Sequence, residues 1–462
     1  MFSLSEIVKA TGGRVINSGT VIEVKGFSID SRSINKDEAF ICIKGDNFDG
    51  HKFIPEAIAK GAKAIIYQLP GHQDTSRPGY QDTRSLGKIA FIKVKDTIKA
   101  LGDLARFNRQ RYDVPVIAVT GSNGKTTTKE MISWILSKKF RVLKNEGTKN
   151  NHIGLPMTLL RLNDQYDIVV LEIGTNHFGE VANLSGICEP NLGVITNIGL
   201  AHLQYLRSLR GVLKEKYSLF KHLRKPGIGI LNGDDPCLRK KIFAKPKNEV
   251  IIGTGIRGAA DFFASKITCD KGKVSFCLNN HHKFTLNTLG YHNIYNALSA
   301  IAIARIFGIS KDGCAVRLSA FDFPEGRLKT IKFKGINFID DSYNANPVSL
   351  GQALAALESI KTSGRKIFLM GDMLELGRKE GFFHLWAGKQ AAKICDVFIT
   401  VGKLSRKAFK AARDAGFNKN NLYNCSNSLT AKEILFKKVA PGKNDVILIK
   451  GSHSLKMGEI IK

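Results

Sequence analysis

Short apolar runs alternate with helix-like segments from the start of the chain. The first apolar runs cover residues 21–24, 39–43 and 64–67, and helix-like pieces cover residues 4–10 and 54–60. Strand-length runs of this kind, separated by segments with helical spacing, predict a small α/β unit at the N-terminus.

The apolar runs after Pro115 are more continuous. They cover residues 116–119, 168–173, 192–196 and 228–231, and helical stretches lie between them. Strands that are apolar on both faces and alternate with helices are typical of a parallel sheet with crossover helices. We therefore predict a second, larger α/β domain here.

A Pro-Glu-Gly-Arg turn at residues 324–327 separates this domain from another series of the same kind. Its apolar runs cover residues 338–340, 366–370, 397–401 and 446–449, again interleaved with helical segments. This pattern predicts a third, doubly wound domain.

These patterns together predict an α/β protein of three domains. We place the domains at residues 1–88, 89–323 and 324–462, with residues 89–114 as a lead-in to the central domain. Three domains suit a length of 462 residues, which is too long for one compact core.

Composition excludes several classes of protein. No segment approaches the ~18 to 20 consecutive apolar residues of a membrane span, and the first residues lack the pattern of a secretion signal. We therefore expect a cytoplasmic protein without a membrane span. The eight cysteines form no C-x-x-C pair, so neither a zinc site nor a disulfide framework is indicated.

The chain is strongly basic, with a formal net charge of +30. Its Lys and Arg residues are spread along the sequence rather than gathered in one block, and no nucleic-acid recognition motif is present. Attraction of an anionic nucleotide substrate accounts for the charge as well as DNA or RNA does. We do not expect nucleic acid to be a partner.

A Gly-rich loop follows the apolar run 116–119. The sequence Thr120-Gly-Ser-Asn-Gly-Lys-Thr-Thr-Thr128 leads into a segment with helical spacing. In such a loop the backbone N–H groups face a phosphate, Lys125 supplies a positive charge and the Thr126 hydroxyl is placed for Mg²⁺. The spacing departs from the common phosphate loop, which has its first Gly where Val119 stands. ATP binding is the leading hypothesis, and a plain Gly-rich turn remains the alternative.

Three strings carry a resemblance to a known family. They are Thr120–Thr128, Asp340-Asp-Ser-Tyr-Asn-Ala-Asn-Pro347 and Gly371-Asp-Met-Leu-Glu-Leu-Gly377, and Asp30-Ser-Arg32, residues 44–51 and Leu448-Ile-Lys-Gly-Ser452 also fit. The chain resembles the Mur ligase family of peptidoglycan synthesis over nearly its whole length.

The resemblance implies a substrate-binding N-terminal domain, an ATP-binding central domain and a Rossmann-like C-terminal domain for the incoming dipeptide. It implies a monomeric ligase that uses ATP and Mg²⁺ to join D-alanyl-D-alanine to a UDP-linked muramoyl tripeptide. The tripeptide carboxylate is activated as an acyl phosphate, which the amine of the dipeptide then attacks, and ADP and phosphate are released.

The resemblance also implies residue roles. Lys125, Glu172, His202 and Lys216 are the expected catalytic residues, and Thr126 joins the last three as expected metal ligands. Lys216 falls where related enzymes carry a lysine carbamylated by CO₂, a change that turns an ammonium into an anionic oxygen ligand. The alternatives are that Lys216 is one basic residue on a charged helix face and that His202 is a structural histidine.

Contacts with the substrates are implied in two groups. The expected ATP contacts are Thr120, Gly121, Ser122, Asn123, Gly124, Lys125, Thr126, Thr127, Asn293, Asn296, Arg327, Asp341, Tyr343 and Asn344. The expected contacts with the other substrates are Ser31, Arg32, Lys44, Asp49, His51, Thr148, Asn150, Asn151, Asn346 and Leu374. Asx-turn chemistry is an alternative for Asn344 and Asn346, since a polar loop must also hold its own shape.

Three positions depart from the family pattern: Gln204 and Ser218 stand where acidic residues are usual, and His453 stands where Arg is usual. A catalytically silent nucleotide-binding scaffold therefore remains a rival interpretation. The sister ligase that adds the third amino acid is another, although the strings 340–347 and 371–377 argue against it.

Overall fold

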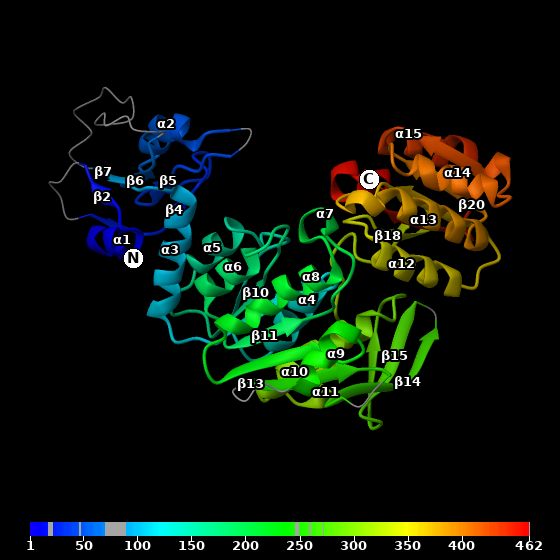
Figure 1. The fold of residues 1–462 in the computed structure, drawn as a ribbon, viewed down its shortest axis with the longest axis horizontal. Helices are drawn as coiled ribbons and strands as arrows, with labels where there is room; N and C mark the ends of the chain where they lie inside the picture. Colours follow the sequence, from blue (N-terminus) through cyan, green and yellow to red (C-terminus); the bar gives the residue numbers. More distant parts are fainter. Residues whose placement is uncertain are drawn as a thin grey trace.

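The computed structural model describes residues 1–16, 22–45, 48–69, 89–244, 249–257, 260–270 and 272–461. Three α/β lobes follow one another along the long axis of the molecule, from the N-terminal lobe in blue to the C-terminal lobe in yellow to red (Figure 1). None of the helices in these ranges is long and apolar enough to cross a membrane.

The N-terminal domain has a five-stranded sheet in the order β2-β7-β6-β5-β4, parallel except for β2. Its strands are β2 (Arg14–Val15), β4 (Phe27–Ser28), β5 (Ala39–Ile41), β6 (Ala64–Tyr67) and β7 (Ala90–Lys93). A short antiparallel pair, β1 (Phe2–Ser3) with β3 (Glu23–Val24), and the helices α1 (Leu4–Thr11) and α2 (Ile54–Ala59) complete it.

Strand β7 lies just after the expected boundary between the N-terminal and central domains, at residues 88 and 89. It pairs in parallel with β6, so the part of the lead-in at residues 90–93 belongs to the N-terminal sheet by its hydrogen bonds. The sequence grouped these residues with the lead-in to the central domain, which continues into the helix α3 (Thr97–Arg111). The division of the chain as a whole stays a prediction.

The central domain is built on a nine-stranded sheet in the order β16-β15-β14-β13-β12-β11-β8-β10-β9. Strands β8 to β14 are mutually parallel, and β14, β15 and β16 form an antiparallel meander. The strands are β8 (Val116–Thr120), β9 (Val142–Lys144), β10 (Ile168–Glu172), β11 (Leu192–Ile195), β12 (Gly227–Asn232), β13 (Glu249–Gly255), β14 (Phe262–Asp270), β15 (Lys273–Leu278) and β16 (His282–Leu286).

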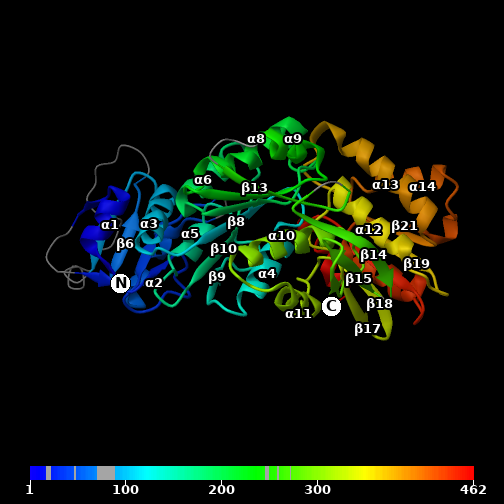
Figure 2. The ribbon, with the colours of Figure 1, turned by 90° about the horizontal axis from the view of Figure 1, so that it is seen from below.

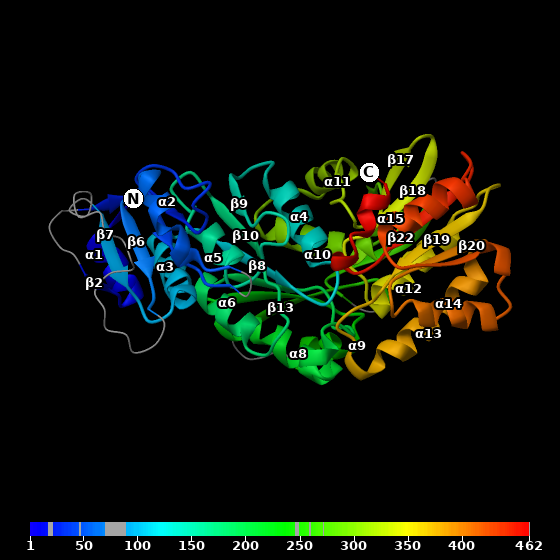
Figure 3. The ribbon, with the colours of Figure 1, turned by 90° about the horizontal axis from the view of Figure 1, so that it is seen from above.

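Helices cover both faces of this sheet. On one face α4 (Lys125–Leu136) and α10 (Asn293–Ile306) lie side by side (Figures 2 and 3). Their buried apolar side chains pack with those of the inner strands. The other helices are α5 (Gly154–Leu159), α6 (Glu180–Cys188), α7 (Leu203–Leu206), α8 (Leu209–Tyr217), α9 (Pro236–Ala244) and α11 (Lys311–Ser319). Continuous apolar strands such as β8 and β10 arise because both faces of the sheet are buried.

The C-terminal domain has a six-stranded sheet in the order β17-β18-β22-β19-β20-β21, parallel apart from β17. Its strands are β17 (Lys329–Phe333), β18 (Ile336–Asp341), β19 (Lys366–Gly371), β20 (Val397–Val401), β21 (Leu422–Cys425) and β22 (Val446–Lys450), and its helices are α12 (Pro347–Ser359), α13 (Glu380–Ile394), α14 (Arg406–Asp414) and α15 (Ser428–Glu433). The last strand, β22, lies between β18 and β19, so the carboxyl ends of these three strands meet at a crevice.

Candidate active site

The loop between β8 and α4 has the backbone geometry of a phosphate-binding loop. Gly121 and Gly124 have φ of +146° and +80°, in the region that side chains rarely adopt. A Cβ on Gly124 would lie 2.4 Å from Asn296 Oδ1, so the loop also packs too closely on α10 for any larger residue. The helix begins at Lys125, inside the Gly-rich string itself, and its N-terminus therefore faces the loop directly.

Lys125 and Asn123 supply this loop with donors. Lys125 Nζ donates to the backbone oxygens of Gly121 (3.0 Å) and Ser122 (3.3 Å), and burial lowers its pKa against the opposing charge of Glu172. Within the described residues, Asn123 Nδ2 is buried without a hydrogen-bond partner. An amine and an amide thus face a cavity where an anion would satisfy both.

Glu172 ends β10 beside the loop and is 1% exposed. It accepts hydrogen bonds from Thr126 Oγ1 (2.8 Å) and Asn150 Nδ2 (2.7 Å). A hydroxyl and a carboxylate are oxygen ligands that suit Mg²⁺, which usually takes few protein ligands and completes its shell with phosphate and water. The described residues contain no group of three or more His, Cys, Asp and Glu side chains that could hold a metal by themselves. The donor set therefore fits a Mg²⁺ ion that arrives with a nucleotide.

Lys216 lies behind this pair, near the end of α8, and is 1% exposed. Burial and the nearby charge of Lys125 lower its pKa well below the ordinary value. Its Nζ makes no hydrogen bond and no ion pair with any residue in the described ranges. A lowered pKa makes the neutral amine easier to form, and the neutral amine is the form that reacts with CO₂.

His202 approaches from the start of α7, where its φ is +53°. Its Nδ1 lies 2.6 Å from Glu375 Oε2, on the loop that follows β19 in the C-terminal domain. The backbone N–H of Gln204 donates to the backbone oxygen of the same Glu375, at 3.2 Å. The carboxylate beside His202 thus comes from another domain and not from position 204.

A chain of side-chain hydrogen bonds fixes the start of α10. Asn296 Oδ1 accepts from Thr128 Oγ1 (3.1 Å), and its amide donates to Asn293 Oδ1 (2.8 Å). Asn293 in turn donates to Thr288 Oγ1 (3.2 Å). The two asparagines that we expected to contact the nucleotide are therefore held in one orientation at the start of α10, between Thr128 of the phosphate-loop helix and Thr288.

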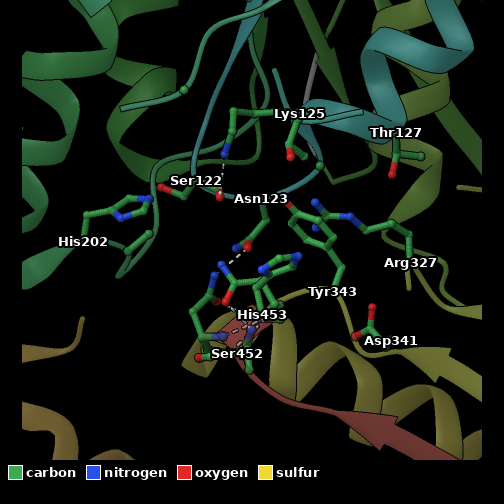
Figure 4. A pocket seen from close by; sticks show the side chains of 18 of the residues that line it. Ser122, Asn123, Lys125, Thr127, His202, Arg327, Asp341, Tyr343, Ser452 and His453 are labelled. Atoms are coloured by element: carbon green, nitrogen blue, oxygen red, sulfur yellow. Dashed lines mark hydrogen bonds between the residues drawn. The ribbon is translucent and has the colours of Figure 1, made fainter. Parts of the chain in front are cut away.

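Arg327 enters the site from the segment between the central and C-terminal domains. Its guanidinium lies 3.9 Å from the centre of the Tyr343 ring, and its Nη2 is 3.4 Å from Thr126 Oγ1 (Figure 4). The imidazole of His453 lies on the same tyrosine, with ring centres 5.3 Å apart. A cation held over an aromatic ring is stabilised in place, so Tyr343 orients Arg327 toward the loop.

A further hydrogen bond joins the central and C-terminal domains at the same cavity. Asn346 Nδ2 donates to Asn123 Oδ1 at 2.6 Å, while Asn346 Oδ1 accepts from Ser349 N (2.9 Å) and caps α12. Asn346 therefore caps α12, and its side chain also touches the phosphate loop.

These groups meet at one cavity of about 510 Å³. Of the residues expected from the sequence, the following line it: Ser122, Asn123, Gly124, Lys125, Thr127, Thr148, Asn150, Glu172, His202, Asn293, Asn296, Arg327, Asp341, Tyr343, Asn344, Asn346 and Leu374. Thr120, Gly121, Thr126 and Lys216 are not among its lining residues. Asn151 is not among the lining residues, and its side chain accepts from the backbone of Ile153 and Gly154 at the start of α5.

Five expected substrate contacts lie in the N-terminal domain and do not line this cavity. They are Ser31, Arg32, Lys44, Asp49 and His51. Ser31 Oγ donates to Glu56, and Asp49 Oδ1 lies 2.5 Å from His51 Nδ1. A ligand that reached both groups would span two domains, as a long substrate such as a UDP-linked peptide does.

Several lining residues carried no assigned role in the sequence: Gly174, Thr175, Asn176, His292, Ser349, Gln352, Lys450, Ser452 and His453. Glu375 lines the cavity as well, and the resemblance implied only that residues 372–376 as a group would line it. Lys450 and Ser452 belong to the string 448–452, and Glu375 belongs to the string 371–377. Both strings resemble the family, but the resemblance could not show which of their side chains would face the cavity. Asp372, in contrast, holds the backbone of Ser405 and does not line the cavity.

Comparison with known proteins places these features in a family. Residues 23–109 match the model described as Mur ligase family, catalytic domain, residues 119–304 match the Mur ligase middle domain, and residues 326–453 match the Mur ligase, glutamate ligase domain. The chain belongs to the Mur ligase family.

Within that family the chain is similar to one kind of ligase. It is 36% identical to the UDP-N-acetylmuramoyl-tripeptide–D-alanyl-D-alanine ligase of Bacillus subtilis, over 100% of this chain and 97% of that protein. A crystal structure of MurF from Acinetobacter baumannii covers 99% of this chain and 97% of its own, with 31% identity and a TM-score of 0.87. The MurF ligase of Thermotoga maritima in complex with ADP covers 95% of this chain and 96% of its own, with 26% identity and a TM-score of 0.81.

Proposed function

We propose that this chain is an ATP-dependent ligase that joins D-alanyl-D-alanine to UDP-N-acetylmuramoyl-tripeptide in cytoplasmic peptidoglycan precursor synthesis, and that it acts as a monomer. One observation carries the proposal. The phosphate loop of the central domain and the loop 343–346 of the C-terminal domain face the same cavity. A nucleotide on one wall and an incoming amine on the other can therefore meet an acyl group.

The first half of the reaction must bring two anions together. An oxygen of the tripeptide carboxylate attacks the γ-phosphorus of ATP, the bond to the β-phosphate oxygen breaks, and ADP leaves with that electron pair. Lys125 and Arg327 place positive charge on opposite sides of the loop where the transferring group would lie. Cations held in position in this way stabilise the charge that spreads over the phosphoryl oxygens.

Mg²⁺ would be held by Thr126 and Glu172, and when bound it neutralises phosphate charge and orients the transferring group. Asn150 orients the Glu172 carboxylate from the side away from Thr126. We propose that Lys216 is carbamylated and that His202 completes the metal site once it leaves Glu375. The burial of Lys216 and its lowered pKa support the first proposal.

In the second half the amine of the dipeptide attacks the acyl carbon. The carbon–oxygen bond to phosphate breaks, phosphate leaves with the electron pair, and the amine gives up a proton as the amide forms. Asn346 and Leu374 stand on the C-terminal wall where this dipeptide would lie. We propose that the UDP end of the other substrate is bound in the N-terminal domain by Ser31, Arg32, Lys44, Asp49 and His51.

The test is phosphate release from Mg-ATP in the presence of UDP-linked tripeptide, with and without D-alanyl-D-alanine, together with mass detection of the product. The proposal predicts release that requires the dipeptide and a UDP-linked pentapeptide as product. Binding of ATP without turnover under these conditions would contradict it, and would support the scaffold interpretation instead.

A further inference from the structure

Lys450 is the last residue of β22, the strand that lies between β18 and β19 at the crevice of the C-terminal sheet. It is 1% exposed, and Asp341 and Met370 flank it on the neighbouring strands. Its Nζ donates to Asp341 Oδ2 at 2.5 Å and to the backbone oxygen of Asn344 at 3.0 Å. One buried ammonium thus joins the end of β18 to the loop that follows it.

The contact continues to the domain border through the other oxygen of the same carboxylate. Asp341 Oδ1 accepts from the backbone N–H of Leu328, at 3.2 Å. Leu328 has a φ of +54° and directly follows Arg327. Lys450 therefore fixes three parts of the cavity wall: the Asp341 carboxylate, the loop at Asn344 and the backbone next to Arg327.

The charges of this pair depend on each other. Burial raises the pKa of Asp341 and lowers the pKa of Lys450. The positive charge of Lys450 reduces the rise at Asp341, and the negative charge of Asp341 reduces the fall at Lys450. Arg327 and Asp340 are the other charged groups that act on both. The imidazole of His292 faces Lys450 but stays neutral, because burial lowers its pKa to about 4. Without Lys450, the buried Asp341 would lose the larger of the two cationic interactions that favour its ionised form and would keep only the weaker one with Arg327.

We propose that Lys450 is a positioning residue for the nucleotide, which keeps Asp341 as an ionised acceptor and holds Asn344 and Arg327 in place at the cavity wall. The inference rests on the proposed function only in requiring that this cavity binds ATP. It predicts that replacing Lys450 weakens nucleotide binding more than it slows the chemical step.

The test compares Lys450→Met with Arg365→Met by calorimetric titration with Mg-ADP and by urea unfolding. Arg365 pairs with Asp445 at the opposite end of the same sheet (2.7 Å), so its loss removes an ion pair far from the cavity. Lys450→Met should raise the Kd for ADP by about 10- to 100-fold, the cost of a lost charged hydrogen bond. Arg365→Met should lower stability and leave the Kd unchanged.

A cycle with Asp341→Asn separates positioning from a general loss of structure. The double variant Asp341→Asn, Lys450→Met should bind ADP no more weakly than Lys450→Met alone, because both changes break one contact. If Lys450→Met does not fold, Lys450→Gln replaces it in the same comparison, because glutamine keeps a hydrogen-bond donor without the charge. An unchanged Kd in a folded variant, or additive effects in the cycle, would overturn the inference while leaving the ligase proposal intact. A wild-type chain that binds no ADP would overturn both.

Discussion

His202 Nδ1 lies 2.6 Å from Glu375 Oε2, and this contact joins the central domain to the C-terminal domain at the edge of the active-site cavity. Both residues have a positive φ, +53° and +63°, which non-glycine residues adopt only where their surroundings hold them. Two strained turns that face each other across a domain boundary indicate that the contact helps to fix the arrangement of the domains.

Replacing Glu375 with Ala should loosen that arrangement. The variant loses the carboxylate that holds His202, so we expect a broader distribution of interatomic distances in small-angle scattering without nucleotide. Glu358→Ala, at an exposed position on α12 of the same domain, is the matched control and should leave the profile unchanged. Identical profiles for Glu375→Ala and the wild type would show that the contact does not hold the domains.

Gly124→Ala should abolish most nucleotide binding. The residue has a φ of +80°, and a Cβ would lie 2.4 Å from Asn296 Oδ1, so the loop must move away from α10. We expect the Kd for Mg-ADP to rise by at least about tenfold, which corresponds to roughly 1.4 kcal/mol. Calorimetric titration measures it directly.

Gly416→Ala controls for backbone strain in that experiment. Gly416 has a φ of +86°, no atom lies within 4 Å of the point that a Cβ would occupy, and the residue lies in the C-terminal domain away from the cavity. The substitution should cost about 1 to 2 kcal/mol of stability through strain alone and leave the Kd unchanged. Equal Kd values for Gly124→Ala and the wild type would contradict the close packing of the loop on α10.

Lys216 should carry a carbamate that Lys214 does not. Protein incubated with ¹³C-bicarbonate should give a carbamate carbon signal in NMR that disappears in Lys216→Met and persists in Lys214→Met, because Lys214 is exposed and Lys216 is buried. Phosphate release should fall by about 100-fold or more in Lys216→Met alone, the usual size of a lost electrostatic contact to the transition state. A signal that survives in Lys216→Met would place the carbamate elsewhere.

Stability should depend on pH through Asp167, which Arg141 holds by two hydrogen bonds from its guanidinium and one from its backbone N–H. These bonds lower the pKa of Asp167 to about 2, against an ordinary value of 3.8. Because the folded pKa is the lower one, the contribution is complete above about pH 4 and is lost as the pH falls toward 2.

Urea unfolding at several pH values checks this sign. The difference in urea midpoint of unfolding between the wild type and Asp167→Asn should be largest near about pH 5. It should shrink as the pH falls toward about 2.5. Asp164→Asn, at an exposed aspartate three residues earlier, is the control. A difference that stays constant with pH would mean that Asp167 is not held in its ionised form by Arg141.

The parallel sheets could be predicted from sequence, because strands buried on both faces read as continuous apolar runs. The runs at 116–119 and 168–173 became β8 and β10 for this reason. The meander of β14 to β16 was not identified, since β14 has a single buried residue and no continuous apolar run. Strand β7 pairs with the N-terminal sheet, which the sequence could not show, because a local pattern does not tell which sheet a strand joins.

The site could be predicted where one segment contains the chemistry. The phosphate loop and the carboxylate of Glu172 at a strand end are of this kind. The pairs His202–Glu375 and Lys450–Asp341 could not be predicted, because their members lie far apart in the chain and meet only through the packing of domains and the order of strands. A buried ion pair leaves no periodic signal in either of the segments that form it.

The most direct measurement uses UDP-linked tripeptide whose reacting carboxylate is labelled with ¹⁸O on both oxygens. If the carboxylate attacks the γ-phosphorus and the amine then attacks the acyl carbon, one ¹⁸O passes to the released phosphate and the other stays in the new amide. Mass spectrometry after turnover with Mg-ATP and D-alanyl-D-alanine should therefore find phosphate carrying a single ¹⁸O beside the pentapeptide product. Product formed with unlabelled phosphate would contradict the acyl phosphate, and unlabelled phosphate without product would contradict the ligase itself.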